Sequence, residues 1–215
     1  MNETVWLLEA PQQEEHESRR WNTFYMQSST LVNFNRKANK FLRKFIEEYN
    51  PSSHNFQVLD IAMGQGRNSI WLAQKGYKVI GFDPSIEGIQ IAKNQAKQLN
   101  LTTLQAYVAA IEEFDFGSKQ WDLIVCMYFP IINNTDYLRR IEQSLKYNGL
   151  LIVEVFHWDG LNGEYSLPIG VTYRTNAIPS FFPNLTTSMY EEPTDYSDFG
   201  NLLTKIIRYV GQKQY

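Results

Sequence analysis

The sequence predicts an α/β fold, a Rossmann-like, doubly wound and mostly parallel sheet with helices on both faces. Short apolar runs typical of buried strands alternate along the chain with longer segments of helical spacing, and this alternation is typical of parallel sheets. Residues 58–69 combine a strand, a glycine turn and a helix start in immediate succession. With 215 residues, 43% of them hydrophobic, the chain is long enough for one well-filled domain.

The run 58–69 predicts how a nucleotide-like ligand would be held. Val58 to Met63 is apolar except for Asp60, and Gly64 and Gly66 then allow a sharp turn and a close approach of backbone to a ligand. The helix that follows presents free amides at its N-terminus, which attract an anionic group. A second strand, Lys78–Asp83, ends in an acid about twenty residues past the glycines, a placement that suits two ribose hydroxyls.

The other elements follow in an order that continues the alternation. Apolar residues between Trp21 and Tyr49 predict an amphipathic helix that ends before Pro51 and lies against the sheet. Gly149 is interpreted as a helix stop before a strand that is buried on both faces. The remaining expected elements are a helix from Ile70 towards Gly76, helices at Glu87–Leu99, Thr135–Lys146 and Ala177–Phe182, strands at Leu104–Ala109, Trp121–Tyr128, Leu150–Phe156, Leu185–Glu191 and Leu203–Gly211, and a loop at Trp158–Tyr173.

Composition excludes several classes of function. The net charge of −3, with 20 basic residues scattered along the chain, argues against nucleic acid as a partner. The longest apolar segment, Leu123–Ile132, is too short to cross a bilayer, so no membrane partner is expected. His16, His54 and His157 lie far apart in the sequence, so no metal is implied.

The cysteine content and the N-terminal residues indicate a cytoplasmic protein. Cys126 is the one cysteine, it lies in an apolar run, and it cannot form an intramolecular disulfide. The N-terminus has neither the basic start nor the apolar stretch of a signal peptide. Residues 1–20 are expected to form a polar arm, either solvated or folding over the site, and residues 21–215 a single domain.

The sequence of the glycine loop distinguishes between two nucleotide-binding families. A dinucleotide-binding loop requires glycine or alanine where this chain has Ser69. The run from Asp60 through Gly64 and Gly66 instead resembles motif I of the class I S-adenosylmethionine-dependent methyltransferases. Gly64-Gln65-Gly66-Arg67-Asn68-Ser69 is similar to the loop of small bacterial tellurite-resistance and thiopurine-type methyltransferases. The resemblance extends from about Trp21 to the C-terminus and is strongest over Val58–Phe156.

This resemblance implies a seven-stranded sheet with an antiparallel pair at its end, S-adenosylmethionine as cofactor and a small-molecule acceptor. Gly64 and Gly66 would approach the methionyl carboxylate, Asp60 the ammonium and Asp83 the ribose. Anchoring of turn amides by Asp60 and a helix cap by Asp83 are the alternatives. Ala110 stands where many relatives place an acid for the adenine amine, and Glu112 is a substitute. The implied cofactor-binding residues are Asp60, Ala62, Gly64, Gly66, Arg67, Asn68, Asp83, Pro84, Ala110, Ile111, Tyr128 and Tyr25.

Two residues are candidates for catalysis. His157 lies just past the fifth strand, where doubly wound sheets place active-site groups, and imidazole titrates near neutrality. Tyr128 ends the fourth strand, beside the expected methyl group. Both have structural alternatives, as a packed histidine and a core aromatic, and alignment of the acceptor alone can accelerate methyl transfer. Further candidates in the acceptor pocket are Asp159, Tyr165 and Tyr173, with Phe129 beside Tyr128 and Trp21 as a cofactor cover.

The leading hypothesis is therefore a methyltransferase that releases S-adenosylhomocysteine and acts as a monomer or homodimer. A non-catalytic S-adenosylmethionine-binding module acting through a partner is the alternative, kept open by Ala110 at the adenine position. A nicotinamide-dependent oxidoreductase is disfavoured by the glycine pattern.

Overall fold

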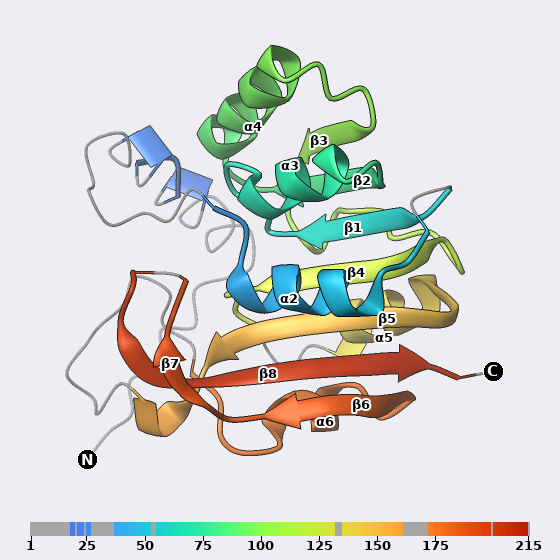
Figure 1. The fold of residues 1–215 in the computed structure, drawn as a ribbon, viewed down its shortest axis with the longest axis vertical. Helices are drawn as coiled ribbons and strands as arrows, with labels where there is room; N and C mark the ends of the chain where they lie inside the picture. Colours follow the sequence, from blue (N-terminus) through green and yellow to red (C-terminus); the bar gives the residue numbers. More distant parts are fainter. Residues whose placement is uncertain are drawn as a thin grey trace.

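The computed structural model describes residues 18–19, 21–23, 25–26, 37–52, 55–131, 135–160, 172–198 and 200–214. One twisted sheet forms the middle layer, with α2, α3 and α4 on one face and α5 and α6 on the other (Figure 1). The α/β class with helices on both faces is thus confirmed. Within the described residues no helix is long and apolar enough to cross a membrane.

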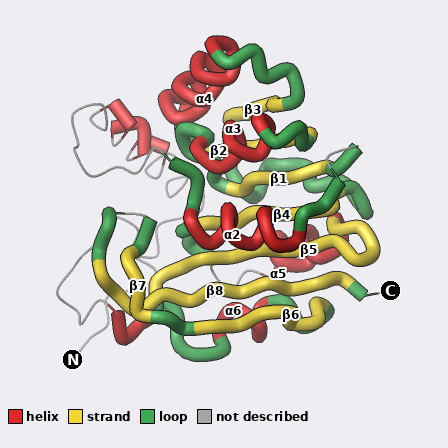
Figure 2. Tube along the Cα trace, in the orientation of Figure 1, coloured by secondary structure: helices red, strands yellow, loops and turns green. Residues whose placement is uncertain are grey.

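The elements alternate as the sequence predicts through the first five strands (Figure 2). In chain order they are α2 (Lys40–Tyr49), β1 (Gln57–Ile61), α3 (Arg67–Gln74), β2 (Lys78–Asp83), α4 (Ile86–Gln98), β3 (Leu104–Val108), β4 (Trp121–Met127), α5 (Thr135–Ser144), β5 (Leu145–Phe156), the short 3₁₀ helix η1 (Trp158–Gly160), α6 (Ala177–Phe181), β6 (Leu185–Glu191), β7 (Thr194–Tyr196) and β8 (Leu203–Lys213).

The strand order is β3-β2-β1-β4-β5-β8-β6, and β7 pairs with β8 off this path. The strands β1 to β5 pair in parallel, whereas β8 runs antiparallel to β5, β6 and β7. Because β1, β2 and β4 are neighbours and run the same way, their carboxyl ends meet at one edge of the sheet. Ligands of doubly wound sheets bind at this edge, where the strand order reverses.

The core has two layers because successive side chains of a strand face opposite sides of the sheet. Leu59, Ile124 and Val153 pack on one side, against α5 and α6. Val58, Val125 and Ile152 pack on the other, against α2 and α3. These residues from the central strands are fully buried, which fits the unbroken apolar runs of the sequence.

Three boundaries differ from the prediction. The helix α2 begins only at Lys40, because the side chain of Asn39 caps it by accepting a hydrogen bond from the Leu42 amide; Phe34 lies outside the described residues. The helix α5 ends at Ser144, five residues before Gly149. Gly149 lies inside β5, where a Cβ atom would come within 2.8 Å of the Trp121 carbonyl, so interpreting it as a helix stop was wrong.

The C-terminal part also contains more structure than predicted. The expected loop at 158–173 begins with η1, and its residues 161–171 lie outside the described part. The strand β7 was not predicted and makes the sheet eight-stranded. Its three residues are too short for a period-two pattern to be recognised in the sequence.

Candidate cofactor site and acceptor side

A tight loop connects β1 to α3 and is held by backbone hydrogen bonds. The Met63 amide donates to the Phe82 carbonyl (3.0 Å) and the Gly66 amide to the Met63 carbonyl (2.9 Å). Ala62, Gly64 and Gly66 all have positive φ, of 53°, 55° and 81°. Such a backbone is unfavourable for alanine, and strained residues of this kind cluster at ligand sites. Tyr128, at the end of the neighbouring strand β4, shares the feature with φ of 57°.

Asp83 connects the end of β2 to this loop. One carboxylate oxygen accepts a hydrogen bond from the Gly64 amide (2.9 Å) and the other from the Ser85 amide (2.8 Å). The N-cap of α4 is Ser85, whose hydroxyl accepts from the Gly88 amide, so Asp83 is not the helix cap. Burial raises the Asp83 pKa to about 6 despite the two amides. A carboxylate has about four acceptor positions, so two remain for hydroxyl donors.

Asp60 is the penultimate residue of β1 and is 1% exposed. Its carboxylate accepts hydrogen bonds from the Ser69 hydroxyl (2.5 Å) and from the Ser69 backbone amide. Burial raises the Asp60 pKa to about 7, although the Ser69 hydroxyl and the charge of Arg67 oppose the shift. Within the described part of the chain neither Asp60 nor Asp83 forms an ion pair.

Tyr25 covers the loop from the N-terminal side. A Cβ atom on Gly64 would come within 2.2 Å of the Tyr25 hydroxyl, and one on Gly88 within 3.1 Å of its ring. Burial and the charge of Asp83 raise the Tyr25 pKa well above its ordinary value. Trp21 stacks on Tyr25 with ring centroids 6.1 Å apart. The structure therefore brings the predicted covering aromatics to the glycine loop.

The segment that carries Tyr25 is attached to the start of α4. The side-chain oxygen of Asn22 accepts hydrogen bonds from the Ser85 hydroxyl (2.7 Å) and the Glu87 amide (3.2 Å). The Ser18 hydroxyl donates to the carbonyl of Pro84 (3.0 Å), which places Pro84 beside this segment. No local pattern in the sequence marks Asn22, because its contacts depend on tertiary structure.

The other predicted loop residues contact different neighbouring segments. The missing Cβ of Gly66 points at Ala92 of α4, 2.9 Å away, so this glycine is needed for helix packing. The amide oxygen of Asn68 accepts from the Asn39 amide (2.9 Å) and ties α3 to α2. The guanidinium of Arg67 donates to the Lys37 carbonyl (3.1 Å).

The end of β3 lies beside Asp83, as the adenine prediction requires. The Ala109 amide donates to the Asp83 carbonyl (3.2 Å), and the Ala110 carbonyl accepts from the amides of Glu113 and Phe114. Ile111 is buried against the core, whereas the Glu112 side chain is exposed. The structure therefore places Ala110 next to the acid of β2 but does not bring Glu112 into a buried contact.

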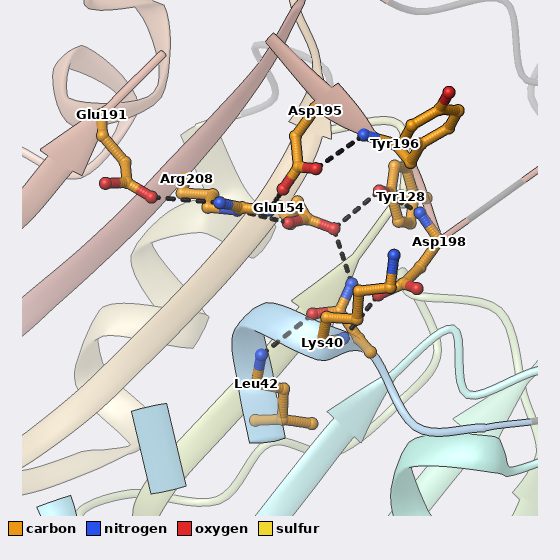
Figure 3. Close-up of polar contacts among 10 residues, drawn as sticks. Lys40, Leu42, Tyr128, Glu154, Glu191, Asp195, Tyr196, Asp198 and Arg208 are labelled. Atoms are coloured by element: carbon orange, nitrogen blue, oxygen red, sulfur yellow. Dashed lines mark hydrogen bonds and ion pairs between the residues drawn. The ribbon is translucent and has the colours of Figure 1, made fainter. Parts of the chain in front are cut away.

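On the acceptor side, Glu154 of β5 anchors a buried polar network (Figure 3). It accepts hydrogen bonds from the Tyr128 hydroxyl (2.6 Å), the Asn39 side-chain amide (2.6 Å) and the Arg208 guanidinium (2.7 Å). The Tyr128 hydroxyl also accepts from the Asp198 amide (3.1 Å). Burial and the adjacent Glu154 carboxylate raise the Tyr128 pKa well above its ordinary value.

The sequence analysis missed Glu154 and Arg208. An acid inside the apolar run Leu150–Phe156 was the available signal, because a charge on a strand buried on both faces needs a partner. Arg208 supplies it and also contacts Asp195 (2.7 Å) and Glu191 (3.3 Å). The similar run in β1 contains Asp60, which has no such partner in the described residues.

His157 lies at the end of β5, 2% exposed, in a second polar cluster. Its Nδ1 accepts from the Asp159 amide (3.0 Å), which puts the proton of the neutral ring on Nε2. Nε2 lies 3.2 Å from the Thr175 hydroxyl and 3.4 Å from the Glu192 carboxylate. Lys205 contacts the same Glu192 carboxylate at 3.0 Å. Both ring nitrogens therefore already have partners.

The remaining acceptor candidates are dispersed. Tyr173 is buried, and its hydroxyl donates to the Ile131 carbonyl (2.9 Å). The side chain of Asp159 is exposed, 3.6 Å from both His157 and Lys205. Phe129 is partly buried against the core, and Tyr165 lies outside the described residues.

Comparison with known proteins agrees with this geometry. Residues 58–149 match the model of a methyltransferase domain. Two curated relatives are ubiquinone biosynthesis O-methyltransferases. The protein from Rickettsia akari is 24% identical over 54% of this chain and 46% of its own length, and that from Pelagibacter ubique is 31% identical over 46% and 41%. The matched stretch thus spans less than half of these relatives.

Solved structures with the same fold cover more of the chain. The [4+2]-cyclase SpnF has a TM-score of 0.75 at 11% identity and covers 94% of this chain and 96% of its own. TehB from Haemophilus influenzae has a TM-score of 0.60 at 18% identity, with coverage of 79% and 66%. An S-adenosylmethionine-dependent methyltransferase from Methanosarcina mazei has a TM-score of 0.63 at 17% identity, with coverage of 78% and 97%.

S-adenosylmethionine is the cofactor of this family, and the residues present fit it. The loop turns through three residues of positive φ, and two buried acids without a cationic partner in the described structure stand on β1 and at the end of β2. Residues 58–149 thus match a methyltransferase domain, and the described fold is that of solved S-adenosylmethionine-dependent methyltransferases.

Proposed function

We propose that this chain transfers a methyl group from S-adenosylmethionine to a small organic acceptor and releases S-adenosylhomocysteine. The observation that carries the proposal is a pair of buried acids beside the glycine loop, Asp60 and Asp83, which form no ion pair with the described residues. The cofactor supplies an electrophilic methyl group. The chain supplies a carboxylate for the methionyl ammonium at Asp60, acceptors for the ribose hydroxyls at Asp83 and a cover at Tyr25.

The acceptor class rests on the room that the fold leaves and on the relatives. The described residues form one sheet with its helices and connecting segments, and no separate recognition domain is built from them. The named relatives act in ubiquinone biosynthesis, and a solved structure of this fold is a geranyl diphosphate C-methyltransferase. We propose a cytoplasmic enzyme, monomeric or homodimeric, without a nucleic-acid or membrane partner.

Within this proposal His157 is the candidate base and Tyr128 positions the end of β4. Glu192 and Thr175 hold the Nε2 proton of His157, so Nδ1 has the lone pair that would take a proton. The Asp159 amide occupies that lone pair and must release it for His157 to act. Because the Tyr128 hydroxyl donates to Glu154, its part is to orient the strand end beside the acceptor.

The test has two stages. S-adenosylmethionine and S-adenosylhomocysteine should each raise the melting temperature of the purified chain, because a ligand that binds only the folded state stabilises it. NAD is the control. Equal stabilisation by NAD, with none by S-adenosylhomocysteine, would contradict the cofactor assignment. A screen of small-molecule acceptors with S-adenosylhomocysteine release as readout then identifies the acceptor and the methylated atom.

The base assignment is tested with the acceptor that the screen identifies. We expect His157→Ala to lower kcat about 10²–10⁴-fold and to remove an ionisation from the pH profile of the rate, with cofactor affinity retained. A raised acceptor KM with an unchanged pH profile would instead assign His157 a positioning role. If the variant kept full activity, alignment of the acceptor with the methyl group would account for methyl transfer without a base at His157.

A second candidate is a module of the same fold that binds the cofactor without transferring its methyl group. The solved structure with a TM-score of 0.75 carries the name of a [4+2]-cyclase, so this fold also serves a protein named for another reaction. Turnover with any acceptor in the screen excludes the candidate. Cofactor binding with no methyl transfer across the screen supports it.

A further inference from the structure

A cationic cleft lies on the face of the sheet that α2, α3 and α4 cover. It has a volume of about 190 Å³ and is lined by side chains from α2, α3 and α4, which share one face of the sheet (Figure 1). Its polar lining consists of Lys37, Arg43, Arg67, Gln74 and Gln95, with the Trp71 indole as an apolar wall. No carboxylate is among the described residues that line it.

The two arginines have unused hydrogen-bonding capacity. The Nε of Arg43 is buried and has no hydrogen-bond partner, and no ion pair of Arg43 is formed within the described residues. The guanidinium of Arg67 makes one hydrogen bond in this part of the chain, to the Lys37 carbonyl. An arginine has five N–H donors, so most of the donors on these two side chains are available to a ligand.

Leaving a buried N–H donor without a hydrogen-bond partner destabilises a protein, so the Nε of Arg43 needs an explanation. The described side chains that line the cleft do not neutralise Arg43, because they include glutamines but no carboxylate. A bound anion does. Arginine forks match the geometry of phosphate oxygens, and glutamine amides can donate to the same oxygens.

The size of the cleft restricts the ligand further. Pockets that enclose a whole small molecule have volumes of roughly 300–1,000 Å³, which is more than this cleft offers. The cleft therefore suits a phosphate group, and any organic part would lie outside it. We propose that this cleft binds phosphate, either as the free ion or as the phosphate group of a monoester.

Calorimetric titration of the full chain tests the proposal without reference to methyl transfer. Inorganic phosphate should bind saturably with one site, whereas sodium chloride at equal ionic strength should not. Arg43→Gln should weaken phosphate binding by about tenfold or more, the loss expected for charge-assisted hydrogen bonds. Lys44→Gln is the matched control, because it removes the same charge from the adjacent, exposed position of α2.

A second variant keeps the test decisive if Arg43→Gln fails to fold. Gln95→Glu places a carboxylate in the cleft, where it should pair with the guanidinium groups, abolish phosphate binding and raise the melting temperature. Tighter binding of glycerol 3-phosphate than of inorganic phosphate would assign a monoester, and equal binding the free ion. The proposal is overturned if the parent shows no saturable phosphate binding, if Lys44→Gln weakens binding as much as Arg43→Gln, or if Gln95→Glu binds as the parent does.

Discussion

Acids on different strands of the sheet have opposite electrostatic environments. On β1 and β2, Asp60 and Asp83 are buried beside a hydroxyl and backbone amides, and burial raises their pKa values to about 7 and 6. On β5, Glu154 pairs with Arg208 of β8. Burial alone would raise the pKa of Glu192, but hydrogen bonds from Tyr190, Lys205 and Thr175 outweigh it and lower that pKa to about 2.

The difference separates acids that are paired within the chain from the two acids that we propose bind the cofactor. Arg208 and Lys205 satisfy their carboxylates within the chain, so these pairs hold β5, β8 and the segment after β6 together. Asp60 and Asp83 form no such ion pair with the described residues, and a cationic or hydroxyl-bearing ligand would stabilise their ionised forms further.

Removing Glu154 should cause the largest loss of stability. Glu154→Ala leaves Arg208, Tyr128 and Asn39 without their shared acceptor, and breaking a buried pair from one side costs about 3–5 kcal/mol of unfolding free energy. Urea unfolding measures this loss of unfolding free energy. Glu191→Ala is the matched control, because its contact with the same arginine is exposed and should contribute less than about 1 kcal/mol. Equal effects of the two variants would show that Glu154 is not the anchor.

Asp83→Ala should mainly affect binding. Loss of hydrogen bonds to a charged group weakens S-adenosylhomocysteine binding by about 1.5–3 kcal/mol, measured by calorimetry. Asp115→Ala serves as the control, since Asp115 likewise accepts a backbone amide, that of Gly117, but at the exposed surface. Unchanged affinity in Asp83→Ala would mean that Asp83 only holds the Gly64 and Ser85 amides.

Asp60→Asn should stabilise the free protein while weakening cofactor binding. The folded-state pKa of about 7 lies above the unfolded value near 3.9, so ionising Asp60 destabilises the fold increasingly from about pH 4 to 7 and constantly above. Removing the charge should therefore add about 1–2 kcal/mol to the unfolding free energy at pH 8, because asparagine recovers only part of the destabilisation that ionised Asp60 causes. At pH 3 the gain should vanish. A loss of stability at pH 8 would indicate that a cation already compensates Asp60.

Much of the fold was predictable because its signals are local. The apolar runs of β1, β2, β4 and β5 and the turn at Gly64 stand out in the sequence, and each is an element of the structure. Gly149 was misassigned because its close approach to Trp121 depends on the register between β4 and β5. The strand β7 forms only because β8 extends beyond its pairing with β5.

The candidate site was predictable in its residues but less so in their contacts. The neighbouring strands β1 and β2 placed Asp60 and Asp83 near one another, as parallel pairing requires. The role of Gly66 in packing against Ala92, and the tie of Asn68 to Asn39, depend on how α3 sits against α4 and α2, which no local pattern encodes. The partners of His157 come from separate segments of the chain. Only the folded structure therefore shows that both ring nitrogens of His157 already have partners.

Proton release on cofactor binding tests the central contrast most directly. Calorimetry of S-adenosylhomocysteine binding at pH 6.5, in buffers of different ionisation enthalpy, counts the protons released. Because Asp60 has a pKa of about 7, it is largely protonated at this pH and must ionise to accept the ligand ammonium. We predict net proton release at pH 6.5 that disappears by pH 9 and is largely lost in Asp60→Asn. Binding with no proton release at pH 6.5, or equal release in Asp60→Asn, would contradict the account.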